Sequence, residues 1–279
     1  MITTSDIGEA ARAYDVLAPY YDDFTTGYAY EPWIAAIEQR ALSLGLHGRR
    51  ALDLGCGTGN STAPLLSRGY SVLAGDISPE MIRAARRKYP QHAAAFRVID
   101  MQSLPPLGEF DLVLCLDDAI NYLLSDDELD ATFRGVKNVL APRGIFAFDV
   151  NSLLTYRTSF AQDMVKEAHG LLLAWQGETS CSFNRGEIAT AKVAIFTECE
   201  TGGWQRAEMR HVQRHHPPHA VRRALNQAGL TCTLAGQHPG ARLEDVVDDE
   251  RHIKIVYFAQ HAAPAMGMAV ESEGTGGCV

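Results

Sequence analysis

The strongest chemical signal in the sequence is a glycine-rich segment, Asp53–Gly59, that directly follows an apolar run. Glycines stand at the alternate positions 55, 57 and 59, and an acid stands two residues before the first of them. Glycine allows positive φ angles and lets backbone N–H groups approach a ligand closely. A turn of this kind, between a strand and the start of a helix, is typical of nucleotide-cofactor sites. We therefore expect a cofactor that lies against the backbone of this segment.

A second acid stands at the end of the next apolar run. Asp76 follows residues 70–74 and lies 17 residues after Gly59. Because an acid at the tip of the second strand can accept both ribose hydroxyls of a cofactor, we expect Asp76 to bind the ribose. NAD enzymes use an acid in the same way, so this residue does not distinguish the cofactors. The glycine spacing does, because G-x-G-x-G differs from the dinucleotide pattern G-x-G-x-x-G.

The elements that position these residues predict a doubly wound α/β sheet. Helices are expected after Ser78 and over 126–140, and a turn is expected at 142–144. The strands are expected at 51–54, 70–74, 96–99, 110–116 and 145–150. Ligands bind beyond the carboxyl ends of the strands in such sheets. The candidate residues that follow strands are Gly55, Asp76, Asp100, Asp117 and Asp118.

Together these motifs resemble the class I S-adenosylmethionine (SAM) methyltransferases, roughly over residues 10–260 and most strongly over 52–150. The resemblance implies SAM as the cofactor, S-adenosylhomocysteine as the product, and a Rossmann-like seven-stranded sheet that ends in an antiparallel strand. It implies that the glycine turn holds the methionine part of SAM and that Asp100 and Met101 bracket the adenine. Asp53 is expected near the turn. The residues implied at the cofactor are Tyr14, Tyr21, Asp53, Gly55, Cys56, Gly57, Gly59, Asp76, Ile77, Met81, Asp100, Met101 and Leu116.

Two segments lie outside this core, which is expected at 46–155 and 214–261. Residues 1–45 read as helical and are rich in tyrosine and acids, and the resemblance implies that they form a lid over the cofactor. The alternative is an amphipathic helix whose tyrosines pack on the sheet. Residues 156–213 read as an inserted antiparallel sheet that roofs the active site, as in relatives that methylate amines of small metabolites and amino sugars. The tail, 262–279, is expected to be disordered.

The inserted sheet and the end of the core can be divided into individual elements. The inserted strands are expected at 171–176, 187–199 and 206–213, and their turns at 184–186 and 201–203. A helix over 220–228 and strands at 230–236 and 253–259 are expected to complete the core.

Asp117 and Asp118 favour an amine as the methyl acceptor. A free alkyl amine has a pKa of ~10.4, so reaching its neutral form at pH 7 costs roughly 4–5 kcal/mol. An acidic pocket attracts the cation, and an apolar roof favours loss of its proton. The alternative is that one acid caps a helix and the other is solvated. Further candidates are His211 as a base, with His215 and His216 nearby, and Tyr20, Tyr122 and Asn151 as substrate contacts.

Composition limits the other classes of function. The net charge of −9 argues against a nucleic-acid substrate, and the sequence contains no apolar run long enough to span a membrane. The six cysteines include no C-x-x-C pair, which favours a reducing cytoplasm without disulfides. The His215-His216-x-x-His219 pattern is not expected to bind a metal, because the intervening prolines start a helix. The inserted sheet could mediate a homodimer.

We therefore expect a SAM-dependent methyltransferase that acts on an amine nitrogen of a small metabolite. Alkaloid, amino-sugar or antibiotic biosynthesis is the expected setting, and methyl transfer is expected to occur by in-line displacement, which depends on positioning. Methylation of a hydroxyl oxygen is the main alternative. An NAD(P)-dependent oxidoreductase and a SAM-binding scaffold without activity are the others.

Overall fold

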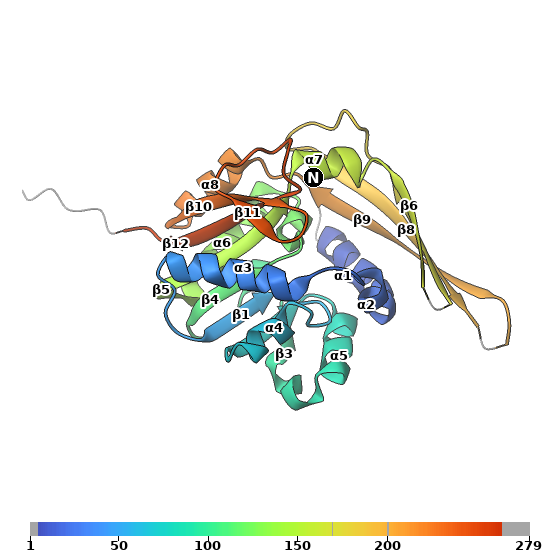
Figure 1. The fold of residues 1–279 in the computed structure, drawn as a ribbon, viewed down its shortest axis with the longest axis horizontal. Helices are drawn as coiled ribbons and strands as arrows, with labels where there is room; N and C mark the ends of the chain where they lie inside the picture. The colour runs from blue at the N-terminus through green and yellow to red at the C-terminus, as the bar shows by residue number, and fades with distance from the viewer. Residues whose placement is uncertain (1–4, 169, 200, 264–279) are drawn as a thin grey trace, which may run out of the picture.

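Residues 5–168, 170–199 and 201–263 are described by a computed structural model (Figure 1). They form a large sheet covered by helices and a second, antiparallel sheet that projects away from it. The predicted disorder of the tail concerns residues that lie, from 264 onward, outside the described residues. Among the helices described, none is long and apolar enough to cross a membrane.

The large sheet has eight strands in the order β11-β10-β12-β5-β4-β1-β2-β3. Its bounds are β1 Arg50–Leu54, β2 Ser71–Asp76, β3 Phe96–Val98, β4 Phe110–Cys115, β5 Leu140–Asn151, β10 Leu230–His238, β11 Arg242–Glu244 and β12 Lys254–His261. β1 to β5 pair in parallel, whereas β12 is antiparallel to both β5 and β10. This confirms the doubly wound α/β fold with an antiparallel final strand. The short edge strand β11 was not predicted.

The predicted turn at 142–144 is instead an irregularity within β5. Leu140 pairs with Phe110, and Ile145 pairs with Leu112, so the residues between them are in excess on the β5 side. β5 follows α6 without an intervening loop, because the residue after the helix, Leu140, already has an extended backbone with φ −82° and ψ 125°.

Helices cover both faces of the large sheet. The residues of α6 (Asp126–Val139) and α8 (Pro218–Gln227) pack on one face, and those of α3 (Tyr30–Ser43) and α4 (Thr62–Ser67) pack on the other. α5 (Pro79–Lys88) packs beside β2 and β3. Short 3-10 helices connect these elements and are η2 Pro90–Ala95, η3 Met101–Ser103 and η4 Ala119–Tyr122. Because β1 to β5 are parallel, their carboxyl ends all point toward one side of the molecule.

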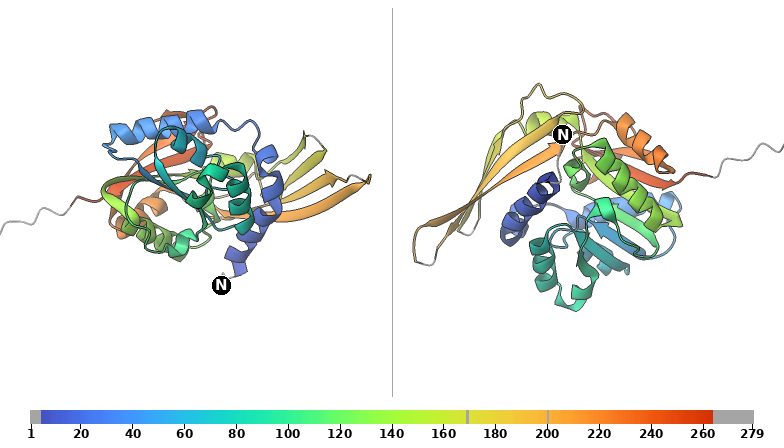
Figure 2. Two further views of the ribbon diagram at one scale, coloured as in Figure 1. Left: turned by 90° about the horizontal axis from the view of Figure 1, so that it is seen from below. Right: turned by 180° about the vertical axis from the view of Figure 1, so that it is seen from behind.

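The N-terminal segment lies across that side. α1 (Ser5–Leu17), η1 (Ala18–Tyr20) and α2 (Tyr21–Phe24) are called the lid here. Leu17 of the lid shares an apolar cluster with Met81 of α5 and with Val193 and Met209 of the second sheet. The lid is therefore packed between the core and the second sheet, as the views from below and behind show (Figure 2).

The second sheet contains β6 Asp163–Ala168, β7 Leu171–Gly177, β8 Ile188–Glu198 and β9 Trp204–Arg214, in that order, and all its pairs are antiparallel. The three predicted strands are present, and β6 was missed because three of the six residues in its sequence, DMVKEA, are charged. α7 (Leu153–Thr158) connects β5 to this sheet. Trp175 on β7 donates a hydrogen bond from Nε1 to the Ser159 carbonyl, 2.8 Å away, which ties the sheet to the end of α7.

Candidate active site

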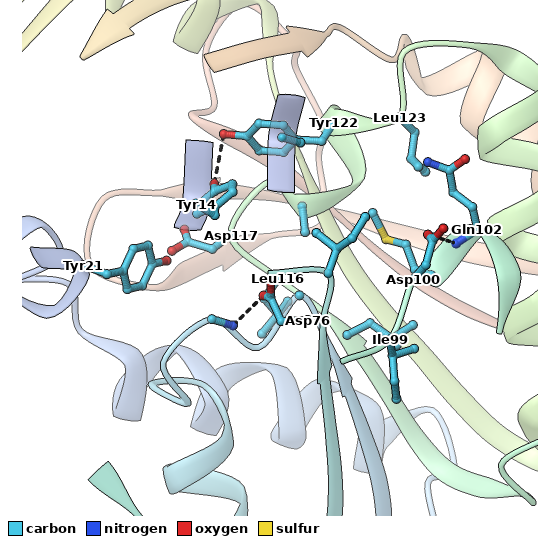
Figure 3. A pocket seen from close by; sticks show the side chains of 17 residues that line it. Tyr14, Tyr21, Asp76, Ile99, Asp100, Gln102, Leu116, Asp117, Tyr122 and Leu123 are labelled. Carbon is cyan, nitrogen blue, oxygen red and sulfur yellow. Dashed lines mark hydrogen bonds between the residues drawn. The ribbon is translucent and has the colours of Figure 1, made fainter. Parts of the chain in front are cut away.

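A cavity lies between the carboxyl ends of β1, β2 and β4 and the lid (Figure 3). We call it the cofactor cavity. Its lining consists of Ala10, Tyr14, Tyr21, Leu54, Gly55, Gly57, Asp76, Ile77, Ile99, Asp100, Met101, Gln102, Leu116, Asp117, Ala119, Tyr122 and Leu123. Most of the residues that the sequence predicted at the cofactor lie in this lining. Their convergence results from the parallel sheet, which brings successive strand ends to one edge.

The glycine turn is shaped by its own backbone and by Asp76. Gly55 and Gly57 have φ angles of 69° and 52°, which side-chain-bearing residues rarely adopt. A Cβ at Gly55 would lie 2.8 Å from the Cβ of Ala119. The Asp76 carboxylate accepts from the backbone N–H groups of Gly57 and Ser78, both at 2.9 Å. Asp76 therefore holds the turn to the start of α5, and burial raises its pKa.

The lining of the cavity suits SAM in its chemistry. A Cβ at Gly57 would lie 3.4 Å from the Tyr21 ring, in van der Waals contact, so a side chain here would point into the space between the turn and the lid. Asp76 lies at the tip of β2, where a ribose would lie. Ile77 and Met101 provide apolar surface for an adenine ring, and Asp100 is held in place by a 2.9 Å hydrogen bond from the Gln102 N–H group.

Asp53 lies outside the cofactor cavity. Its Oδ2 accepts from the hydroxyls of Ser61 at 2.7 Å and Thr62 at 2.6 Å. Burial raises its pKa to about 6, although the two hydroxyl groups counteract this. The fully buried carboxyl therefore joins the end of β1 to the first turn of α4 and supports the glycine turn from below.

Three other residues predicted at the cofactor are also absent from the lining. Cys56 packs in an apolar cluster with Phe96, and a Cβ at Gly59 would lie 3.0 Å from the ring of Phe96 and that of Tyr89. Met81 lies in the cluster beneath α1. Cys56 and Met81 therefore pack in apolar clusters of the core and of the lid rather than against the cavity.

A second, larger cavity of about 720 Å³ adjoins the first. We call it the acceptor cavity. It lies between the lid, α7, the second sheet and the ends of β5 and β12, and it shares Tyr14, Tyr21, Asp117 and Tyr122 with the cofactor cavity. The remaining lining residues are Phe24, Thr25, Tyr28, Asp118, Asn151, Leu154, Thr155, Thr158, Ser159, Phe160, Gln162, Asp163, Met164, Trp175, His211, Gln213, Ile253 and Lys254.

Asp117 and Asp118 form a strained turn between β4 and η4. Both have positive φ angles, 62° and 61°, which costs energy for residues with a side chain. The buried Asp149 carboxylate on β5 accepts from both of their backbone N–H groups, each at 2.8 Å. This pair of hydrogen bonds holds the turn in its unusual conformation.

Lys254 lies at the centre of these acids. Its Nζ is 2.9 Å from Asp117 Oδ1, 3.1 Å from Asp149 Oδ1 and 3.8 Å from Asp118 Oδ1. Asp117 Oδ2 also accepts from the Tyr30 hydroxyl at 2.9 Å. Neither acid makes a helix-capping bond, and neither is fully solvated. The alternative in which one acid caps a helix and the other is solvated therefore does not describe them.

The two acids differ in their free hydrogen-bonding capacity. Asp118 Oδ2 accepts from the side-chain amides of Asn151 and Gln213, both at 2.7 Å. Asp118 Oδ1 makes no hydrogen bond with any described residue, and both oxygens of Asp117 are used. Burial raises the pKa of Asp118 to about 6, whereas Lys254 outweighs burial and lowers the pKa of Asp117.

His211 on β9 ends a chain of hydroxyl groups. The Tyr14 and Tyr122 hydroxyls are 2.9 Å apart, and the Tyr122 hydroxyl is 2.6 Å from His211 Nδ1. His211 Nε2 has no hydrogen-bond partner among the residues that the structure describes. The ring stacks on Trp175 with centroids 5.5 Å apart. Burial lowers the pKa of His211 to about 4, so the ring is neutral at pH 7.

The other sequence candidates lie elsewhere. Tyr20 lines neither cavity and packs in the apolar cluster of the lid. His215 Nε2 lies 3.2 Å from Asp249 Oδ1, and His216 Nε2 lies 2.9 Å from the Leu123 carbonyl. Both histidines are buried structural residues outside the cavity linings.

Sequence reasoning missed Asp149, Lys254, Gln213 and Trp175. Asp149 carried a usable signal, because it is the only charge in the apolar run 145–150. Lys254 stands at the first position of β12, and no local pattern indicates which acids it meets. Gln213 and Trp175 come from the second sheet, whose packing on the core depends on the tertiary fold.

Comparison with known proteins supports a methyltransferase. A family model described as a methyltransferase domain matches residues 51–144. The putative methyltransferase YqeM of Bacillus subtilis is 27% identical over 83% of this chain and 94% of its own length. The human methyltransferase-like protein 27 is also 27% identical, over 85% of this chain and 90% of its own length.

Solved structures show the same fold over nearly the whole chain. A SAM-dependent methyltransferase from Clostridium acetobutylicum has a TM-score of 0.74 and 23% identity, and the match covers 90% of this chain and 99% of that one. The sugar N-methyltransferase KedS8 from Streptoalloteichus has a TM-score of 0.68 and 22% identity, with 86% and 93% covered. The family model places a methyltransferase domain at residues 51–144, and the solved structures show the methyltransferase fold over nearly the whole chain. Together with the glycine turn and Asp76, these matches support SAM as the cofactor.

Proposed function

We propose that the protein transfers the methyl group of SAM to an amine nitrogen of a small metabolite. The observation that carries the proposal is Asp118 Oδ1, a carboxylate oxygen in the acceptor cavity with no hydrogen bond from any described residue. Its partner oxygen is held by Asn151 and Gln213, so the free oxygen has a defined direction. An ammonium or amine N–H group is the natural donor for it.

The charge of the acceptor cavity also favours a cation. Asp117, Asp118 and Asp149 surround one lysine, so the cluster stays negative when all four groups are ionised. Aromatic rings complete the wall. Because the face of an aromatic ring attracts a cation, an amine is better accommodated here than a carboxylate. The rings are Tyr14, Tyr21, Phe24, Tyr28, Tyr122, Phe160 and Trp175.

The reaction requires a neutral nitrogen placed in line with the methyl group. SAM supplies an electrophilic methyl group on a sulfonium. In the proposal Asp118 Oδ1 binds the ammonium and takes its proton, and the nitrogen lone pair then forms the new N–C bond while the C–S bond breaks. The lid and the second sheet exclude water and hold the acceptor. Positioning of this kind can supply up to about 7–11 kcal/mol of the barrier.

The named relatives are consistent with this class of acceptor. KedS8 is described as a sugar N-methyltransferase, and CalS10 from Micromonospora as an amino pentose methyltransferase in calicheamicin biosynthesis. The fold match to CalS10 has a TM-score of 0.63. In the proposal the acceptor is likewise an amine of secondary metabolism, such as an amino sugar or alkaloid. Other relatives act on oxygen, including a magnesium-protoporphyrin O-methyltransferase of Rhodobacter capsulatus.

A direct test offers the enzyme matched acceptors. Purified protein is incubated with methyl-labelled SAM and pairs of amino and hydroxy analogues of one scaffold, and mass spectrometry locates the label. The proposal expects label on nitrogen and little on the hydroxy partner. Label confined to oxygen would overturn it and would direct attention to the neutral His211 as a base.

Asp118→Asn tests the role of the carboxylate. With the wild type, kcat/KM should fall below pH 6, where Asp118 becomes protonated, and should be flat from there to the pKa of the amine. The variant cannot take a proton, so its kcat/KM should keep rising with pH until the amine itself is neutral. At pH 7 the variant should lose activity while its affinity for SAM stays normal. Identical pH profiles for the two proteins would contradict the assignment.

A further inference from the structure

A cluster of two histidines and one glutamate lies outside both cavities, at the edge of the large sheet. His238 ends β10, Glu244 ends β11, and His252 belongs to the loop before β12. His238 Nε2 is 3.1 Å and His252 Nε2 is 3.4 Å from the same carboxylate oxygen, Glu244 Oε2. One potential ligand atom from each residue lies within 4.8 Å of the other two. The three side chains therefore converge on one point.

Each of the two histidines has a ring nitrogen on the side of Glu244 that could bind a metal ion. His238 Nε2 is shielded from solvent and makes no hydrogen bond of good geometry with a described residue, although the carboxylate is near. His252 Nδ1 lies 3.0 Å from both the backbone N and the carbonyl oxygen of Asp248. Nδ1 accepts from the Asp248 N–H group when Nε2 carries the ring proton. When Nδ1 carries the proton and donates to the Asp248 carbonyl instead, the lone pair of Nε2 is directed to the side of Glu244. A ring held through its other nitrogen is typical of metal-binding histidines.

The backbone makes room for this arrangement. A Cβ at Gly236 would lie 2.5 Å from the His252 imidazole, so the buried ring requires glycine at that position. The ring of His238 lies 4.6 Å from that of His252 between centroids. The local sequence thus provides space for two imidazoles beside one carboxylate.

We propose that His238, Glu244 and His252 bind a divalent transition-metal ion, with Zn²⁺ the best match. Two imidazoles and a carboxylate are a common zinc ligand set, and a water molecule can complete the tetrahedron. Without the ion, Arg242 and Arg251 balance the charge of Glu244, at 3.3 Å and 3.4 Å. Both arginines are largely exposed, so they can turn away when the ion binds.

The site would connect the β10–β11 hairpin to the segment that enters the active site. Residues 245–253 run from β11 to β12 and lead directly to Lys254, which contacts Asp117 and Asp149. The metal would therefore fix a loop whose end positions the acid cluster. This inference does not depend on the identity of the methyl acceptor.

The test uses the full chain, purified without a histidine tag and stripped with a chelator. Isothermal titration with Zn²⁺ should show one ion per chain, and Zn²⁺ should raise the melting temperature. Glu244→Gln and His238→Gln should each weaken binding by at least about ten-fold and remove the thermal shift. His219→Gln and Cys181→Ser change other potential surface ligands and should leave both readouts unchanged.

Two results would overturn the proposal. One is the absence of stoichiometric Zn²⁺ binding to the wild type. The other is equal affinity in the wild type and Glu244→Gln, since the amide retains the shape of the side chain and loses its charge. Because Glu244 and His238 are both partly exposed, these variants should fold, and their melting temperatures without metal provide the check.

Discussion

Replacing Asp149 by asparagine should abolish methyl transfer and lower the free energy of unfolding by about 3–5 kcal/mol. The carboxylate accepts from the backbone N–H groups of Asp117 and Asp118 and also contacts Lys254. An amide can present only one acceptor oxygen, so one buried N–H group would face an NH₂ group. The turn would lose the bonds that hold its two positive φ angles.

The measurements are chemical denaturation and transfer of labelled methyl groups. Asp127→Asn makes the same chemical change at an exposed position in the first turn of α6. It should change the free energy of unfolding and the rate of methyl transfer only slightly. A variant at position 149 with normal stability and normal turnover would show that the turn does not depend on the carboxylate. Normal stability with lost turnover would assign Asp149 to the reaction alone.

Asp76→Ala is expected to weaken SAM binding by about 10- to 100-fold, which corresponds to one charged hydrogen bond of roughly 1.5–3 kcal/mol. The carboxylate holds the Gly57 and Ser78 N–H groups, and its place at the tip of β2 suits the ribose. The variant would therefore lose a ligand contact and the support of the glycine turn together.

Calorimetric titration with SAM and with S-adenosylhomocysteine would measure this effect. Asp118→Asn is the matched control, because it changes an acid of the neighbouring cavity and should leave SAM affinity normal. If Asp76→Ala bound SAM as the wild type does, the ribose assignment would be incorrect. The SAM affinity of Asp76→Asn should lie between that of the wild type and that of Asp76→Ala, since its amide oxygen can still accept one backbone N–H group.

The cofactor half of the protein was predictable because its signals are local. The glycine turn, the acid at the tip of β2 and the alternating strands and helices all lie within about a third of the chain. Each of these patterns reflects a backbone requirement, such as positive φ or an apolar strand. Cys56 and Met81 lie outside the lining of the cofactor cavity, and a sequence motif does not show which way each side chain faces.

The acceptor half was harder to predict because its contacts are long-range. Lys254 meets Asp149, 105 residues earlier, only because β12 inserts beside β5 with Lys254 opposite Asn151. The sequence suggested two acids at the end of β4, whereas the structure pairs Asp117 with Lys254 and leaves Asp118 Oδ1, 3.8 Å from Lys254 Nζ, without a hydrogen bond from any described residue. The second sheet adds Gln213 and Trp175, which no local motif connects to Asp118 or His211.

Tyr14 and Tyr21 line both cavities, and this has a kinetic consequence. Because one helical segment closes both compartments, a single detachment of that segment opens the route for the acceptor and for the cofactor alike. We therefore expect entry and exit to be coupled, with the spent cofactor and the methylated product leaving in the same open interval. Turnover would then depend on how often the apolar contact of Leu17 with Met81 and Val193 breaks.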